Sequence, residues 1–125
     1  MMTRKPMVQR TRRLAGRMLT FLLNAEDDTL REFAAASKSG RAAKTLVKQG
    51  AQRITLVALR SGAALPSHRV AGAVSVQTIR GCLKVGTDRG EREVPAGALV
   101  AFAPGVAHTA RAAGDCSILI TVAMP

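Results

Sequence analysis

Aromatic side chains are nearly absent from this sequence, which has three Phe and no Trp or Tyr. Proteins that hold single-stranded nucleic acid by stacking need flat rings along a basic groove, so this composition argues against such a platform. It also argues against a protein interface anchored by aromatic residues. No uncharged apolar run reaches the length of a transmembrane helix. We therefore expect a soluble protein with no membrane partner.

Acidic residues are also scarce, with eight Asp and Glu against nineteen Lys and Arg and a formal net charge of +11. None lies between residues 33 and 87, so any carboxylate chemistry must come from residues 26–32 or 88–115. Residues 1–17 carry six basic groups and no acid. Such an arm attracts phosphate groups without reading sequence, and no helix-turn-helix or zinc-finger spacing accompanies it. We expect no specific nucleic-acid partner, and a nucleic-acid-associating or structural role for residues 4–17 stays open.

Cysteine is limited to Cys82 and Cys116, which could form one disulfide at most. No convincing export signal precedes the domain, because the apolar segment 18–23 is short and follows directly on Arg17. We therefore expect both thiols to be reduced and the protein to be cytoplasmic.

The length of 125 residues is typical of one domain. Residues 1–24 are predicted to be a basic, partly disordered N-terminal arm, and residues 25–125 the folded domain. Within the arm, the apolar spacing of residues 13–24 favours a short helix packed on the domain. A better helix is predicted to begin at Thr29, because Thr29 and Glu32 match a capping box, and to end at Gly40. Its predicted shared face consists of Leu30, Phe33 and Ala34.

After Gly40 the sequence changes to short β-rich segments separated by Gly, Pro and Asp turn residues about every ten positions. This pattern is typical of an antiparallel sandwich or barrel, and it predicts an all-β domain. The predicted strands include Thr45–Val47, Ile54–Val57, Val74–Val76, Leu83–Val85, Leu99–Phe102 and Ile118–Val122.

Both histidines lie in this β-rich region, within two glycine-containing patterns. The first pattern places His68 between Gly62 and Gly81, and the second runs from Gly97 through Pro104-Gly105 to His108. These spacings resemble the two motifs of the cupin family of small jelly-roll barrels. The first family motif is Gly, five residues, His, one residue, His, three or four residues, Glu, six residues and Gly. The second is Gly, five residues, Pro, one residue, Gly, two residues, His, three residues and Asn.

The resemblance covers about residues 51–122 and implies a single cupin-type jelly-roll barrel with an N-terminal helical segment. It also implies a homodimer, because barrels of this family often pair through their sheets. The chain departs from the family at four ligand or motif positions, one of which is Ala103, where the motif has a proline that this chain carries one residue later, at Pro104. Val70 and Val74 replace the second His and the Glu of the first motif, and Ala112 replaces the Asn of the second.

In metal-binding cupins the two His and the Glu of the first motif and the His of the second hold one ion. Here only His68 and His108 are left, and two imidazoles without a carboxylate make a weak site. We therefore expect no cofactor. The alternative is a divalent transition metal on His68 and His108, completed by water, substrate or Cys82, in an enzyme of the isomerase or dioxygenase type.

Without a metal, the resemblance and the strand alternation predict an apolar pocket with two polar groups. Positions 68, 70, 74, 76 and 78 share one parity and face one side of a sheet if no bulge intervenes. Apolar walls with a few polar groups are typical of small-molecule sites, although a barrel filled by its own side chains fits the same pattern. The sequence thus predicts a non-catalytic or weakly catalytic small-molecule-binding barrel, and whether it is an enzyme stays open. The candidate ligand-binding residues are His68, Val70, Val74, Val76, Thr78, Phe102 and His108.

Overall fold

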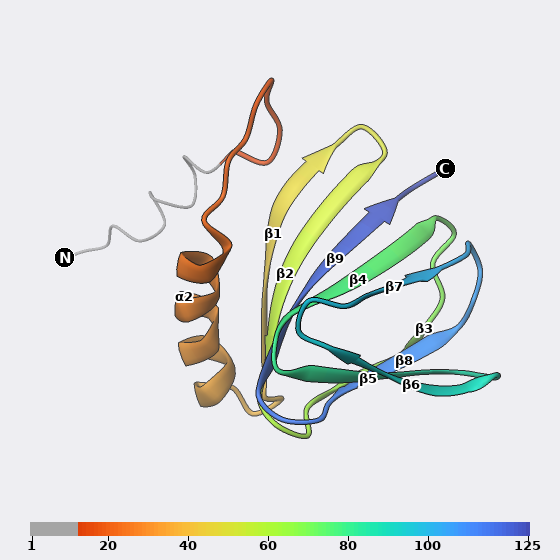
Figure 1. The fold of residues 1–125 in the computed structure, drawn as a ribbon. Helices are drawn as coiled ribbons and strands as arrows, with labels where there is room; N and C mark the ends of the chain where they lie inside the picture. Colours follow the sequence, from red (N-terminus) through yellow and green to blue (C-terminus); the bar gives the residue numbers. More distant parts are fainter. Residues whose placement is uncertain (1–12) are drawn as a thin grey trace.

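The computed structural model describes residues 13–125 (Figure 1). The first part of the predicted arm, residues 1–12, lies outside the described residues. Within the described range, one helix, α2 (Leu23–Ala36), precedes nine strands. The strands are β1 (Arg41–Gln49), β2 (Gln52–Leu59), β3 (Ala64–His68), β4 (Ala73–Arg80), β5 (Cys82–Thr87), β6 (Gly90–Pro95), β7 (Leu99–Phe102), β8 (His108–Ala112) and β9 (Cys116–Ala123).

The strands form two antiparallel sheets. The five-stranded sheet has the order β1-β2-β9-β4-β7, and the four-stranded sheet has the order β3-β8-β5-β6. In Figure 1 the sheets meet near the C-terminal end of α2 and diverge toward the side that carries β7 and β8. The predicted all-β barrel with an N-terminal helical segment is confirmed. All six segments predicted from their β-rich composition lie within strands, and β3, β6 and β8 are additional.

The space between the sheets is a packed apolar core. Alternation along β4 points Val74, Val76 and Thr78 inward, and each is at most 6% exposed. Both sheets contribute buried residues to this core: Val57, Leu59, Val74, Val76, Leu83, Val85, Val94, Phe102, Ala110, Ala112, Cys116 and Ile118.

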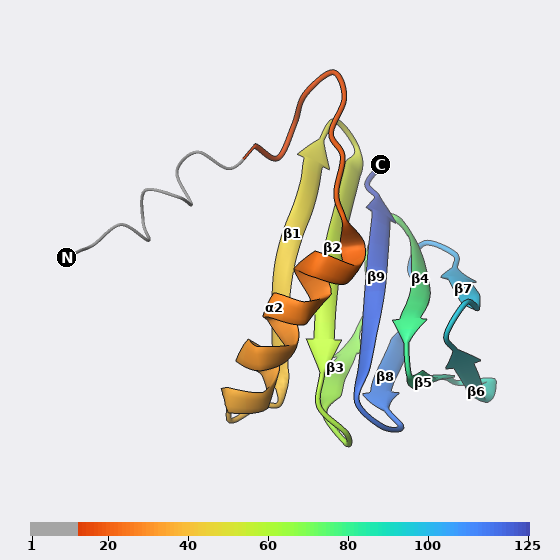
Figure 2. The same cartoon turned by 60° about the vertical axis from the view of Figure 1, so that its left-hand side comes forward.

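Helix α2 covers the outer face of the five-stranded sheet, across β1 and β2 (Figure 2). Leu30 and Ala34 face the sheet and pack with Leu46, Leu56 and Ala58 of the strands. The neighbouring strand residues Val57 and Leu59 point into the barrel instead. The inner and outer faces of β2 are therefore both buried, which explains why this strand reads as a continuous apolar run.

The helix boundaries differ from the prediction. Helix α2 begins at Leu23 after Leu22, which makes no side-chain cap, and Thr29 lies inside the helix. Phe33 is 64% exposed and does not share the buried face of Leu30. Residues 13–22 are not helical, so the predicted short helix over residues 13–24 is wrong. This segment runs beside β1, where the Lys48 amide donates to the Leu14 carbonyl.

The buried face of α2 is completed by a carboxylate. Asp27 is 4% exposed, and its two oxygens accept hydrogen bonds from Ser117 Oγ and, at 3.1 Å, from Arg80 Nε. Arg80 Nη2 also donates to Ser117 Oγ at 2.8 Å, which closes the triangle. The three residues come from α2, β4 and β9, so this network fastens the helix to the middle of the sheet.

The glycines of the two sequence patterns all sit at positions that favour glycine. Gly62, Gly81, Gly97 and Gly105 have positive φ angles of 83°, 77°, 90° and 79°. A Cβ on Gly81 would also lie 2.2 Å from the carbonyl oxygen of Asp115. These turns therefore need glycine for conformation and, at residue 81, for space.

No helix within residues 13–125 combines the length and apolar character needed to cross a membrane.

Replacing Asp27 with Ala tests the network that fastens α2. The change leaves the partly buried guanidinium of Arg80 and the hydroxyl of Ser117 without their shared acceptor, so we expect the free energy of unfolding to fall by about 3 kcal/mol in denaturant titrations. Asp28→Ala is the matched control: its side chain is 71% exposed and lies 3.9 Å from Arg31. Its loss is expected to be within about 0.5 kcal/mol. Equal losses in the two variants would contradict this role for Asp27.

Candidate functional site

The two histidines meet where β3 pairs with β8. His68 ends β3, His108 begins β8, and the two are Cα partners across the ladder. Their ring centroids lie 4.5 Å apart with an interplanar angle of 63°. A register shift between Leu65 and His68 precedes this pair. The meeting of the rings therefore depends on an irregularity that strand alternation does not reveal.

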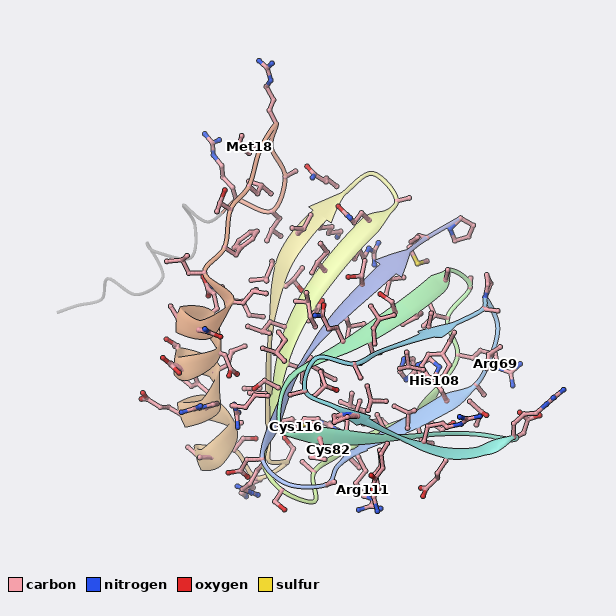
Figure 3. The ribbon with its side chains drawn as sticks, viewed as in Figure 1. Met18, Arg69, Cys82, His108, Arg111 and Cys116 are labelled. Carbon is pink, nitrogen blue, oxygen red and sulfur yellow. The ribbon has the colours of Figure 1, made fainter. Side chains whose placement is uncertain are left out.

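Phe102 joins this pair from the opposite sheet. Its ring stacks on that of His108 with centroids 4.3 Å apart and an interplanar angle of 6°. His108 is 5% exposed, whereas His68 is exposed. Figure 3 shows His108 in the space where the two sheets diverge, which we call the mouth of the barrel. The cluster of Phe102 stacked on His108, with His68 meeting His108 edge-on, thus links β7, β8 and β3.

Hydrogen bonds orient both imidazoles in the same way. His68 Nδ1 lies 3.2 Å from the Pro66 carbonyl oxygen, and His108 Nδ1 lies 3.1 Å from that of Val106. A carbonyl oxygen only accepts, so in each neutral ring Nδ1 carries the proton and donates. The lone pair is then on Nε2, which has no hydrogen-bond partner among residues 13–125 in either ring. Each ring therefore has an oriented acceptor to offer.

The apolar residues predicted around the histidines lie at increasing distance from them. Val74 is the Cα partner of Phe102, and Val70 packs partly buried against the core. Val76 and Thr78 follow on β4, so Thr78 lies about 13 Å along the strand from Val74. The Thr78 hydroxyl is buried, with no partner among the described residues. The structure thus groups His68, His108, Phe102 and Val74, with Val76 and Thr78 deeper in the core.

A polar pocket of about 360 Å³ lies at the end of the four-stranded sheet where β8 begins with His108. His108 lines this pocket and His68 does not; Thr109, which also lines it, alternates with the buried His108 and Ala110 and so faces outward from the barrel. Two carboxylates of the β5–β6 hairpin, Asp88 and Glu91, line the pocket, together with the hydroxyl-bearing residues Ser67, Thr87 and Thr109. Arg69 lines an adjoining hollow that shares Asp88 with it. No sequence motif marks these residues as site residues. The charged side chains of a hairpin are usually solvated, so they are not expected to form a site. The pairing of β5 with β8 brings the β5–β6 hairpin close to His108.

The side chains at this site do not fit the metal centre that the family motifs describe. Val70 and Val74 have no lone pair to donate, and no group of three His, Cys, Asp or Glu side chains within residues 13–125 is placed to hold an ion. Cys82 lies too far away to help. Gly86 pairs with Thr109 on β8, next to His108, and Cys82 is four residues before Gly86, about 13 Å along β5.

The two thiols lie at the end of the barrel away from His108 (Figure 3). Both are free, and Cys116 is buried while Cys82 is partly exposed. Burial raises the pKa of Cys116 from 9.0 to about 11, although the charge of Arg80 opposes the shift. Cys116 is therefore a protonated core residue at neutral pH.

Solved structures with similar folds include several cupins. A conserved protein of unknown function from Streptococcus pyogenes matches with a TM-score of 0.71 at 19% identity, covering 90% of this chain and 93% of that chain. A cupin superfamily protein from Desulfitobacterium hafniense matches with a TM-score of 0.66 at 12% identity, covering 68% and 78%. A salicylate 1,2-dioxygenase from Pseudaminobacter salicylatoxidans matches with a TM-score of 0.70 at 12% identity, covering 79% and 33%.

These likenesses show that the chain has the cupin fold, as the motif spacing predicted. No family model matches the sequence, and no curated protein matches it. The match to the Streptococcus pyogenes protein spans enough of the chain to include part of the region before β1, so that protein shares more than the barrel. At these identities the comparisons establish only the fold. Any inference about chemistry has to come from the residues of the candidate site.

Thiol labelling tests the assignment of Cys116 to the core. At pH 9 an ordinary thiol is half ionised, whereas Cys116, with a pKa of about 11, is only about 1% thiolate. We expect a maleimide to label Cys82 in the native protein at pH 9, with Cys116 labelled only after denaturation. Peptide mapping by mass spectrometry distinguishes the two sites. Rapid native labelling of Cys116 would show that the core around it opens.

Proposed function

We propose that this protein binds a small polar organic molecule at the mouth of its barrel, without a resident metal ion. The observation that carries the proposal is the pair of imidazoles whose Nδ1 atoms are held by the backbone carbonyls of Pro66 and Val106. Their Nε2 lone pairs are left for a ligand, and a pocket of about 360 Å³ that His108 lines lies at the same end of the barrel. Pockets of this size suit small molecules.

The lining supports a ligand that donates hydrogen bonds. Among the lining residues, His108 and the carboxylates of Asp88 and Glu91 can accept, and the hydroxyls of Ser67, Thr87 and Thr109 can do so as well. His68 contacts His108 from outside this lining. A ligand that carries several O–H or N–H groups, such as a polyol or an amine, matches these acceptors. An anionic group facing Asp88 and Glu91 would be repelled.

The packed core favours a site at the mouth over one deep in the barrel. Val74 and Val76 are buried among other apolar side chains, beneath the stacked Phe102 and His108 rings. The valines and Phe102 then belong to the packed core behind His108, and the histidines make the polar contacts. Each imidazole Nδ1 bonds to a backbone carbonyl, and no side-chain nucleophile within residues 13–125 bonds to either ring. This arrangement favours binding with little or no catalysis.

A metal-dependent enzyme of the isomerase or dioxygenase type is the second candidate. One observation favours it: a carbonyl that accepts from Nδ1 also orients histidines that bind metal through Nε2. The two imidazoles would be the protein ligands, and the missing donors at Val70 and Val74 weigh against it.

The first experiment measures the metal content of untagged protein prepared without added metal, by elemental mass spectrometry. We expect far less than one ion per chain. Near-stoichiometric metal that is lost in a His68→Ala, His108→Ala double variant would overturn the proposal in favour of the second candidate.

The second experiment measures binding of a panel of polyols and amines by thermal shift and calorimetry. At least one of them should raise the melting temperature of the wild type. His68→Ala should abolish that rise, because it removes one of the two oriented imidazoles. His68 is exposed, so its loss should disturb little packing.

Glu91→Gln should weaken the same ligand about tenfold, the effect of losing one charge-assisted hydrogen bond. The matched control is Glu93→Gln on the same strand, because Glu93 faces Lys84 across the ladder and lies outside this pocket. Equal weakening in the two variants, or a wild type that binds no member of the panel, would contradict the proposal.

A further inference from the structure

A second pocket, of about 270 Å³, lies between α2 and the outer face of the five-stranded sheet. Three arginines from three elements line it: Arg31 on α2, Arg60 directly after β2, and Arg80 at the end of β4. Arg80 is six residues, or about 20 Å, along β4 from Val74 at the mouth. This site is therefore separate from the histidine pair.

Two of these guanidinium groups are held in place by bonds within the protein. Arg60 Nη1 donates to the carbonyls of Ala35 and Ser37 at the end of α2, at 3.0 and 3.2 Å. Arg80 donates through Nε and Nη2 to Asp27 and Ser117. Each guanidinium has five N–H groups, so each keeps three that are not used by these bonds. Groups that are already fixed lose little freedom when a ligand binds.

The acidic groups near the pocket are largely engaged elsewhere. Asp27 is buried between Arg80 and Ser117. Among residues 13–125, Asp115 is the one carboxylate that lines the pocket, against three arginines, and its Oδ1 accepts from the Ser61 amide at 2.8 Å. Asp28 lies 3.9 Å from Arg31, and both of these side chains are substantially exposed to water. An exposed pair at this distance holds Arg31 only weakly. Arg31 is thus the guanidinium most available to a ligand.

We propose that this pocket binds a small oxyanion, either a carboxylate or a phosphate group. Arginine forks match the planar geometry of a carboxylate and the tetrahedral oxygens of a phosphate, and three forks converge here on one cavity. The side chains of Ala34 and Ala58 also line the pocket and give a compact organic anion a small apolar surface. The bound anion would join α2 to β2 and β4, so binding stabilises the attachment of the helix.

The test titrates the full chain with inorganic phosphate and with succinate, at an ionic strength held constant with sodium chloride. We expect a saturable rise in melting temperature with at least one of the two, confirmed by calorimetry. Binding of phosphate alone assigns the site to phosphate groups, and binding of succinate alone assigns it to carboxylates. No saturable effect from either anion would overturn the proposal.

Arg31→Gln is the informative variant, because Arg31 belongs neither to the Asp27 network nor to the carbonyl contacts of Arg60. It should weaken the anion at least tenfold while circular dichroism and the melting temperature without anion stay unchanged. Arg53→Gln on β2 removes the same charge outside the pocket and should bind like the wild type. Equal weakening in Arg53→Gln would show a general charge effect and overturn the proposal. His68→Ala should leave anion binding unchanged, which separates this site from the mouth.

Discussion

Burial of strand β2 on both faces, between α2 and the barrel core, is the constraint on which the rest of the structure depends. Along β2, Leu56 and Ala58 face α2 while Val57 and Leu59 face the barrel, so no position in this stretch meets water. Each large apolar side chain buried this way contributes about 1.5–3 kcal/mol relative to exposure. Ser117 on β9 is a buried polar residue on the outer face of the sheet. Its hydroxyl donates to Asp27 and accepts from Arg80, so it is not buried without hydrogen-bond partners.

The same packing divides the molecule into two ends with different chemistry. Strand β4 runs from Val74, beside Phe102, to Arg80, beside Asp27. Between them the inward side chains fill the barrel, so a ligand at the mouth has no open path to the far end through this part of the core. Two carboxylates and one arginine, Arg69, lie near His108, whereas three arginines line the pocket at the far end. The strongly basic composition is thus not spread evenly, and the polar groups at the mouth are mostly acidic or neutral.

Sequence patterns predicted those parts of the fold that local composition determines. The β-branched segments became strands, whereas β3, β6 and β8 contain Pro66, three consecutive charges at 91–93, and small residues such as Ala110. These three strands owe their conformation to pairing within the four-stranded sheet, since strand propensity depends on context. The start of α2 was missed for a similar reason. Burial of Asp27 against the sheet extends the helix beyond the capping pattern at Thr29.

For the candidate site, too, the sequence predicted what local patterns determine and missed what depends on contacts between distant segments. Glycine spacing identified both histidines, because the turns that aim their strands need positive φ angles at fixed positions. The face-to-face contact of His108 with Phe102 and the approach of Asp88 and Glu91 depend on register across two sheets, which periodicity does not contain. Val70 and Val74 indicated from the sequence alone that two of the family's metal ligands are missing. The two valines offer no lone pair, whereas the Nδ1 contacts still hold both imidazoles with Nε2 free of a hydrogen-bond partner within residues 13–125.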